Sequence, residues 1–151
     1  MTGSDEGESW RQYADELTPE QIANYEENEV RLLPEHRDQL VDYARYDVEC
    51  NRMTAQYADL PLPPGSELQD QWVRDFLGDG SWCRRVRWLE CTTGMEDVEV
   101  EINGLQKTDG TYTRRITLNA WDEVVMTSEQ ARTLATALRN AADDLDDLDR
   151  G

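Results

Sequence analysis

The chain is short of large apolar side chains. Leucine, isoleucine, valine and phenylalanine together make up 28 of its 151 residues, and phenylalanine occurs only once. With a formal net charge of −18, this composition borders on that of disordered chains. Five tryptophans and six tyrosines partly compensate, because each ring can bury a large area. The sequence therefore predicts a small core rich in aromatic residues, with frayed ends.

Segments that direct a chain to or across a membrane are also missing. No run approaches the ~18–20 apolar residues of a membrane-spanning helix. Residues 1–8 are acidic and polar and lack the basic and apolar parts of a signal peptide. The three cysteines are an odd set without a C-x-x-C pair, and no N-x-[ST] sequon occurs. We therefore expect a cytoplasmic protein with reduced thiols.

Motifs for catalysis are absent as well. There is no nucleophile elbow, phosphate-binding loop, dinucleotide fingerprint or calcium loop. The residue types of a zinc site are present as His36, Cys50, Cys83 and Cys91. However, Cys83 and Cys91 belong to one predicted strand, about 25 Å apart if it is fully extended. We expect no metal, no cofactor and no enzymatic activity, although 33 acidic residues leave many carboxylate pairs open for hydrolysis.

A β-hairpin is predicted around Ile102 and Ile116, where apolar and polar residues alternate on both sides of a turn. A two-residue Asp109-Gly110 turn would point the two apolar faces in opposite directions. A three-residue loop over residues 108–110 instead pairs Ile102 with Ile116. Gly110 then occupies the left-handed position, where a Cβ is costly. We therefore predict the three-residue loop.

An amphipathic helix follows the predicted strands. Thr127 caps its start, with Gln130 as the reciprocal cap. Its predicted apolar stripe is Ala131, Leu134, Ala135, Leu138, Ala142 and Leu145. The aspartates at 143–147 oppose the helix dipole, so we expect a frayed, solubilising end. The alternative is a surface for a cation or a basic partner.

The N-terminal half is predicted to be helical. Thr18 and Gln21 flank a proline in a pattern typical of a capped helix start. The prolines within residues 60–65 predict an extended linker, and residues 71–77 a short helix. The predicted fold class is α+β, with a helical N-terminal half and a three- to four-stranded antiparallel meander covered by a C-terminal helix. The predicted organisation is a disordered tail (1–8), a helical region (9–59), a proline-rich linker with a short helix (60–80), the meander with its helix (81–147) and a frayed tail (148–151).

The C-terminal block resembles small uncharacterised proteins of actinobacteria and their phages. The resemblance rests on Gly80-Ser81-Trp82-Cys83, on Asp109-Gly110, on residues 127–135 and on Ala141-Ala142-Asp143-Asp144. It covers roughly residues 80–147 and implies an actinobacterial or phage origin, with no activity attached. One lysine against fourteen arginines suits a high-GC host.

Charge is distributed unevenly. Residues 1–80 hold 19 acidic and 6 basic residues, whereas residues 81–151 hold 14 and 9. Six basic residues lie on or beside the predicted strands, namely Arg84, Arg85, Arg87, Lys107, Arg114 and Arg115. The overall field would repel a phosphate backbone, so direct nucleic-acid binding is not expected. The basic residues are left to pair with the acidic half, within one molecule or between two.

Two classes of function fit this sequence. The first is a non-catalytic protein–protein interaction or regulatory protein, for which self-association also fits. Its predicted partner-binding residues are Trp72, Phe76 and Trp82, beside a stiff proline run. The alternative for these rings is to fill the seam between the helical half and the sheet.

The second class is an acidic nucleic-acid mimic that inhibits a DNA-binding protein. A mimic needs carboxylates spaced like phosphates along one helix face. The candidate row is Glu26, Glu29, Glu35, Asp38, Asp42 and Glu49. Arginines at 31, 37, 45 and 52 interrupt it, which is typical of a solvated helix face with salt pairs.

Overall fold

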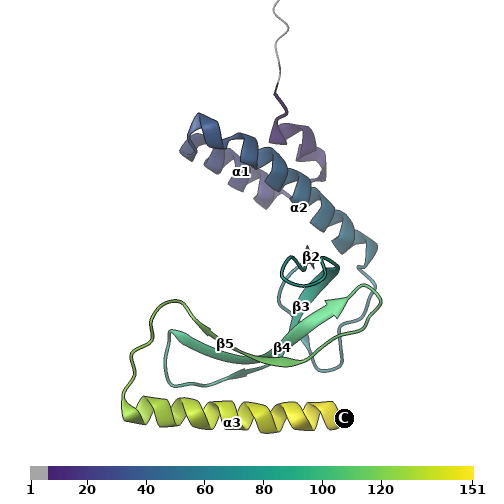
Figure 1. Ribbon diagram of the computed structural model, residues 1–151. Helices are drawn as coiled ribbons and strands as arrows, with labels where there is room; N and C mark the ends of the chain where they lie inside the picture. Colours follow the sequence, from purple (N-terminus) through teal and green to yellow (C-terminus); the bar gives the residue numbers. More distant parts are fainter. Residues whose placement is uncertain (1–6) are drawn as a thin grey trace, which may run out of the picture. The chain divides into compact units, whose positions relative to one another are not determined.

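The computed structural model describes residues 7–151, and the chain divides into two compact units between Ala58 and Asp59 (Figure 1). The N-terminal unit is helical, and the other combines an antiparallel sheet with a long helix. The predicted α+β class is therefore confirmed. The disordered tail predicted at residues 1–8 falls mostly on residues 1–6, which lie outside the described residues.

The helical unit is built around a small aromatic core. Its elements are the 3-10 helix η1 (Trp10–Glu16), α1 (Pro19–Arg31), the 3-10 helix η2 (Pro34–His36) and α2 (Asp38–Gln56). Thr18 and Gln21 form the predicted capping box at the start of α1. The rings of Trp10 and Tyr25 stack at 5.4 Å between centroids, and the Tyr25 hydroxyl donates to Asp47 at 2.6 Å. Aromatic area thus replaces part of the missing aliphatic core, as the composition predicts.

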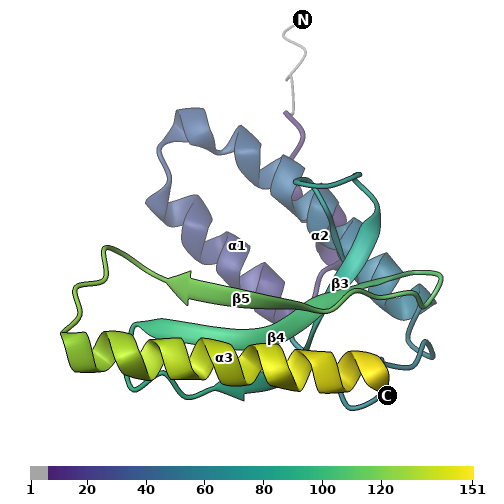
Figure 2. The same ribbon diagram turned by 60° about the horizontal axis from the view of Figure 1, so that its bottom comes forward.

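The second unit is a sheet with one face covered by a helix. Its strands are β1 (Glu67–Leu68), β2 (Val73–Arg74), β3 (Trp82–Cys91), β4 (Val98–Lys107) and β5 (Arg115–Ala120), and the helix is α3 (Ser128–Arg150). The strand order is β1-β3-β4-β5, all antiparallel, and β2 also pairs with β3. Figure 2 shows α3 running along the sheet, where it contacts β4 and β5. The strand β5 therefore forms one edge of the sheet.

The predicted register of the β4–β5 hairpin is confirmed. Ile102 lies opposite Ile116, and the Lys107 amide donates to the Thr111 carbonyl at 2.8 Å across the loop. Gly110 adopts φ +88°, the left-handed conformation that the three-residue loop requires. The apolar residues of both strands consequently share the face that α3 covers.

The proline-rich segment, predicted to be an extended linker, is hydrogen-bonded to the sheet. Prolines lack an amide donor but keep their carbonyl acceptors, and side chains of the sheet use such carbonyls. Gln106 donates to the Pro61 carbonyl at 3.0 Å, and the Trp88 indole to that of Pro64 at 3.0 Å. Arg84 donates to the Leu60 carbonyl at 2.8 Å. These donors lie far along the chain, so the local sequence gives no sign of them.

The prediction of a short helix at residues 71–77 is wrong. Val73 instead pairs with Cys83 in the ladder between β2 and β3. A turn follows, in which the amide of Gly80 donates to the Asp75 carbonyl at 2.9 Å. A helix of one or two turns would leave backbone groups unpaired at both of its ends, whereas the ladder to β3 pairs such groups. Pairing with the sheet therefore outweighs the local helix propensity.

The helix α3 starts as predicted but presents a slightly different face. Its capping box is formed by Thr127 and Gln130. The leucines of the predicted stripe are half-buried, but its alanines are exposed. The buried alanines are Ala137 and Ala141 instead. Because alanines flank the leucines on both sides and each buries little area, the sequence does not select between the two flanks.

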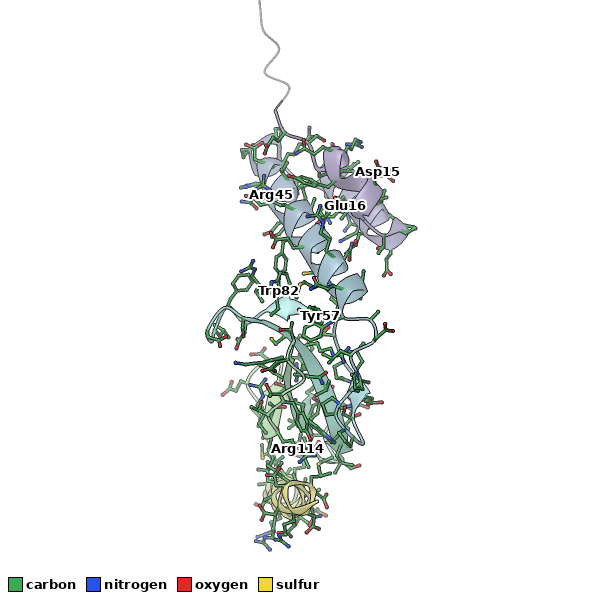
Figure 3. All side chains as sticks on the ribbon, turned by 90° about the vertical axis from the view of Figure 1, so that its right-hand side faces the viewer. Asp15, Glu16, Arg45, Tyr57, Trp82 and Arg114 are labelled. Carbon is green, nitrogen blue, oxygen red and sulfur yellow. The ribbon has the colours of Figure 1, made fainter. Side chains whose placement is uncertain are left out.

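The end of α3 is capped by an arginine from the strand segment. The helix extends to Arg150, beyond the predicted end at residue 147. The Arg114 guanidinium donates to the Leu148 carbonyl at 2.9 Å and pairs with Asp149 at 3.2 Å. It also stacks 4.9 Å from the centroid of the Trp88 ring. Figure 3 shows Arg114 beside the end of α3, where its positive charge offsets the helix dipole and the acidic run.

Within residues 7–151, no helix is both long and apolar enough to cross a membrane.

Candidate protein-binding surface

The three predicted partner-binding aromatics lie in different environments. Trp72 is buried, with the Arg84 guanidinium 5.0 Å from its ring centroid. The ring of Trp82 is half-buried against Arg74, and the Phe76 side chain is 72% exposed. The two tryptophans thus belong to two separate arginine stacks. Their role in partner binding stays a prediction, and burial removes the Trp72 ring from the accessible surface.

The six basic residues of the strands are engaged within the sheet unit itself. Arg85 and Arg87 both pair with Glu101, at 3.4 and 3.3 Å. Lys107 pairs with Asp79 at 3.2 Å. The remaining three are Arg84, which bonds to Gln106, Arg114, which caps α3, and Arg115, which donates to Asn103. Four of the six neutralise a carboxylate or cap a helix inside the fold, and Arg84 and Arg115 donate to neutral side chains, which leaves little basic surface to attract an acidic partner.

The sheet face opposite α3 carries a buried polar network. Glu101 accepts from both arginines and from the Asn103 amide at 3.1 Å, although its side chain is almost fully buried. Asn103 also donates to Thr117 at 2.7 Å and accepts from Arg115 at 3.3 Å. Such a network satisfies its buried polar groups and fixes the register of β3, β4 and β5. With its oxygens occupied by three donors, Glu101 is held in place rather than exposed to a substrate.

The edge strand β5 offers unpaired backbone groups. In an antiparallel ladder, alternate residues bond to the neighbouring strand and the others point away from it. The bonds of Lys107 to Thr111 and of Thr113 to Leu105 show that the odd-numbered residues of this strand bond to β4. The amide and carbonyl groups that point outward therefore belong to Ile116, Leu118 and Ala120. Within the sheet unit, residues 59–151, no backbone or side-chain group bonds to this outer edge.

Trp121 follows β5 directly and is the most exposed tryptophan described. Its side chain is 90% exposed and borders two hollows, one of about 430 Å³ and one of about 630 Å³. The larger hollow lies between the β3–β4 and β5–α3 loops and is lined by four carboxylates and no basic residue. These carboxylates belong to Glu96, Asp97, Asp122 and Glu123. An exposed aromatic ring with an acidic surround suits a basic or amphipathic partner.

Sequence reasoning missed this surface. The alternation around Ile116 predicts a strand, but whether that strand lies at an edge depends on what the other strands pair with. A single tryptophan in a loop is equally compatible with a core position. The combination of a strand without proline or lysine and a following tryptophan is the only local signal.

The candidate row for nucleic-acid mimicry is interrupted in the structure. The carboxylate of Glu29 pairs with Arg11 at 2.7 Å, and that of Asp42 with Arg45 at 3.4 Å. Two of the six carboxylates in the row are thus engaged by arginines, and mimicry stays a prediction. The helical surface therefore carries the salt pairs of an ordinary solvated face.

The residue types of a zinc site are scattered. His36 lies exposed in η2, and Cys83 and Cys91 lie in one strand, β3. Among residues 7–151, no three potential ligands of the His, Cys, Asp or Glu type gather at one place. Burial raises the pKa of the Cys50, Cys83 and Cys91 thiols, which favours the neutral form. Unreactive thiols fit this environment better than a nucleophile or a metal ligand.

Comparison of the chain with protein-family models, with curated proteins and with solved structures gives no match.

Proposed function

We propose that the chain is a non-catalytic protein-binding or regulatory protein, which recognises its partner by adding a strand of that partner to β5. The observation that carries the proposal is the open edge, where Ile116, Leu118 and Ala120 point their backbone groups away from the sheet. Strand addition uses such groups for affinity and nearby side chains for specificity. The exposed ring of Trp121 supplies an anchor at the end of the strand.

The composition of β5 supports this reading. Proteins that keep an edge strand to themselves blunt it with proline, inward charge, a bulge or very short length. Within Arg115–Ala120 the only charge is that of the first residue, and the pairing with β4 is regular over six residues. Leu118 adds an apolar side chain that is 48% exposed. The edge therefore lacks the usual protection against another strand.

The proposed function is tested by capture from an actinobacterial lysate, the host group that the sequence resemblance suggests. The wild-type chain is compared with Leu118→Lys, which places a charge on the edge strand. The matched control is Leu68→Lys, because Leu68 is 51% exposed in β1, away from β5. We expect Leu118→Lys to lose a captured protein that Leu68→Lys retains. Equal capture by both variants would refute strand addition at β5.

Salt separates this function from nucleic-acid mimicry. Strand addition relies on backbone hydrogen bonds and apolar contact, so capture should persist at high salt. A mimic binds through long-range charge, which salt screens within about 10 Å at 0.1 M. Capture that disappears at modest salt and is unaffected by Leu118→Lys would favour the mimic.

A further inference from the structure

We infer that the strand that completes the sheet is β5 of a second copy of this chain, paired antiparallel about a two-fold axis at Leu118. This inference rests on the proposed function and names the partner of the same edge. It follows from the register of the outward groups and from the polarity of charge along the strand.

The register with Leu118 on the axis uses every outward group. An antiparallel two-fold pair matches residues whose numbers have a constant sum. When Leu118 faces Leu118 of the second copy, Ile116 faces its Ala120, and the reverse pair forms by symmetry. All three outward residues then exchange hydrogen bonds with outward residues of the other strand. Moving the axis by one residue leaves one of these three residues outside the paired segments.

The side chains in this register are complementary. The two Leu118 side chains, each 48% exposed, meet on the side of the sheet that carries α3. On the opposite face Arg115 lies across from Trp121 of the second copy, at the position directly before its Asp122. Directly opposed residues have Cβ atoms about 4.5–5.5 Å apart, which is close enough for a guanidinium to reach an aromatic ring. The pairing thus covers both the apolar and the aromatic side chain that the edge leaves exposed.

Charge polarity along the strand favours an antiparallel second copy. The segment begins with Arg115 and is followed by Trp121, Asp122 and Glu123. Antiparallel pairing places the basic start of each strand beside the acidic end of the other, whereas parallel pairing of two copies would set like charges together. The net charge of −18 per chain and the short paired length both limit affinity. We therefore expect a reversible, concentration-dependent dimer.

Sedimentation velocity of the full chain over a wide concentration range tests this pairing, at ~0.15 M salt to limit general repulsion. We expect the wild type to shift from monomer to dimer as concentration rises. Leu118→Lys, which sets two like charges on the axis, should weaken association about tenfold or more, and Leu68→Lys should leave it unchanged. A melting curve for each variant confirms that it is folded. A dimer of unchanged strength in Leu118→Lys would overturn the inference.

A charge exchange tests the register itself. Arg115→Asp should weaken the dimer, because the aspartate then lies at the acidic end of the second copy's strand, where Asp122 and Glu123 follow Trp121. The double variant Arg115→Asp with Asp122→Arg should restore it, since the polarity of both strands is reversed together. Failure of the double variant to recover, while it melts normally, would overturn the Leu118-centred register.

The outcome also separates this inference from the function on which it rests. A wild type that stays monomeric at every concentration would overturn self-pairing. If such a monomer still captures another protein that Leu118→Lys loses, the edge is a binding site for a different partner. If neither self-association nor capture depends on Leu118, both proposals fail.

Discussion

Replacing Gly104 by alanine should strongly destabilise the sheet unit. Gly104 lies in the middle of β4, and its φ is not in the left-handed region, so its backbone conformation is open to any residue. The restriction is space. A Cβ at this position would lie 1.7 Å from the Thr113 carbonyl oxygen and 3.3 Å from Cζ3 of Trp88. The first contact is with backbone, which moves only if the hairpin is displaced.

Whether Gly104→Ala stabilises or destabilises the unit distinguishes a packing clash from backbone propensity. In a strand without neighbours in the way, glycine to alanine stabilises by roughly 0.5–1 kcal/mol, because alanine has less freedom to lose. Overpacking costs about 1–3 kcal/mol and sometimes more, and a clash with a carbonyl belongs at the upper end. We expect a net loss of about 2 kcal/mol or more. For a unit of about this size, that corresponds to a fall in Tm of about 10 °C or more.

Thermal unfolding followed by circular dichroism and by tryptophan fluorescence measures this loss. The control is Gly151→Ala in the same unit, where a Cβ would make only ordinary contacts at 3.8 and 3.9 Å. We expect the control to melt within about 1–2 °C of the wild type, as is usual for an exposed site. A Gly104→Ala variant that melts at or above the wild-type temperature would show that the Thr113 carbonyl does not lie against Gly104.

Three further predictions concern the same unit and the thiols. Arg114→Met should fray the last turn of α3 and cost about 1–2 kcal/mol of stability, because the Leu148 carbonyl loses its charged donor. Thermal melting measures the loss of stability, and hydrogen exchange of residues 145–150 measures the fraying. Unchanged exchange would exclude the capping role. Gly110→Val should destabilise by more than Gly110→Asn, because only asparagine tolerates the left-handed φ of +88° at modest cost; equal melting temperatures would exclude that conformation. Burial raises the thiol pKa values in the folded state, so the neutral thiols contribute stability that is fully present below their unfolded pKa of ~8.5 and is lost as pH rises toward the folded values. Stability should therefore fall at alkaline pH, and a thiol reagent at pH 8 should react faster with the unfolded chain than with the folded one; equal rates would contradict burial of the thiols.

Local chemistry was sufficient to predict the caps and the hairpin. Thr18 and Thr127 each face a glutamine three residues later, and a capping box needs nothing beyond those four residues. The hairpin register follows from the requirement that Ile102 and Ile116 share one face, together with Gly110 at the bulge. These features depend on residues close in sequence, so the amino-acid sequence alone suffices to predict them.

Features that depend on distant partners were not predictable. The proline segment is fixed by donors about 24–45 residues away, and Val73 enters a ladder with Cys83 in place of a helix. The exposure of Trp121 depends on which strand ends the sheet. In each case the competing local propensity is weak, and a tertiary contact decides the outcome.

The two edges of the sheet are treated differently by the same chain. Residues 59–81 supply β1 and β2 to the outer edge of β3, and side-chain donors from β3 and β4 hold the proline segment before them in place. Within the sheet unit, residues 59–151, no strand pairs with the outer edge of β5. If the open edge were only a consequence of a small core, the covered edge would need no such segment, since both edges face the same risk of pairing with another chain. At one edge the sheet is covered by added strands. At the other, β5 is open and regular and is followed by an exposed tryptophan. This arrangement fits best if β5 receives a strand.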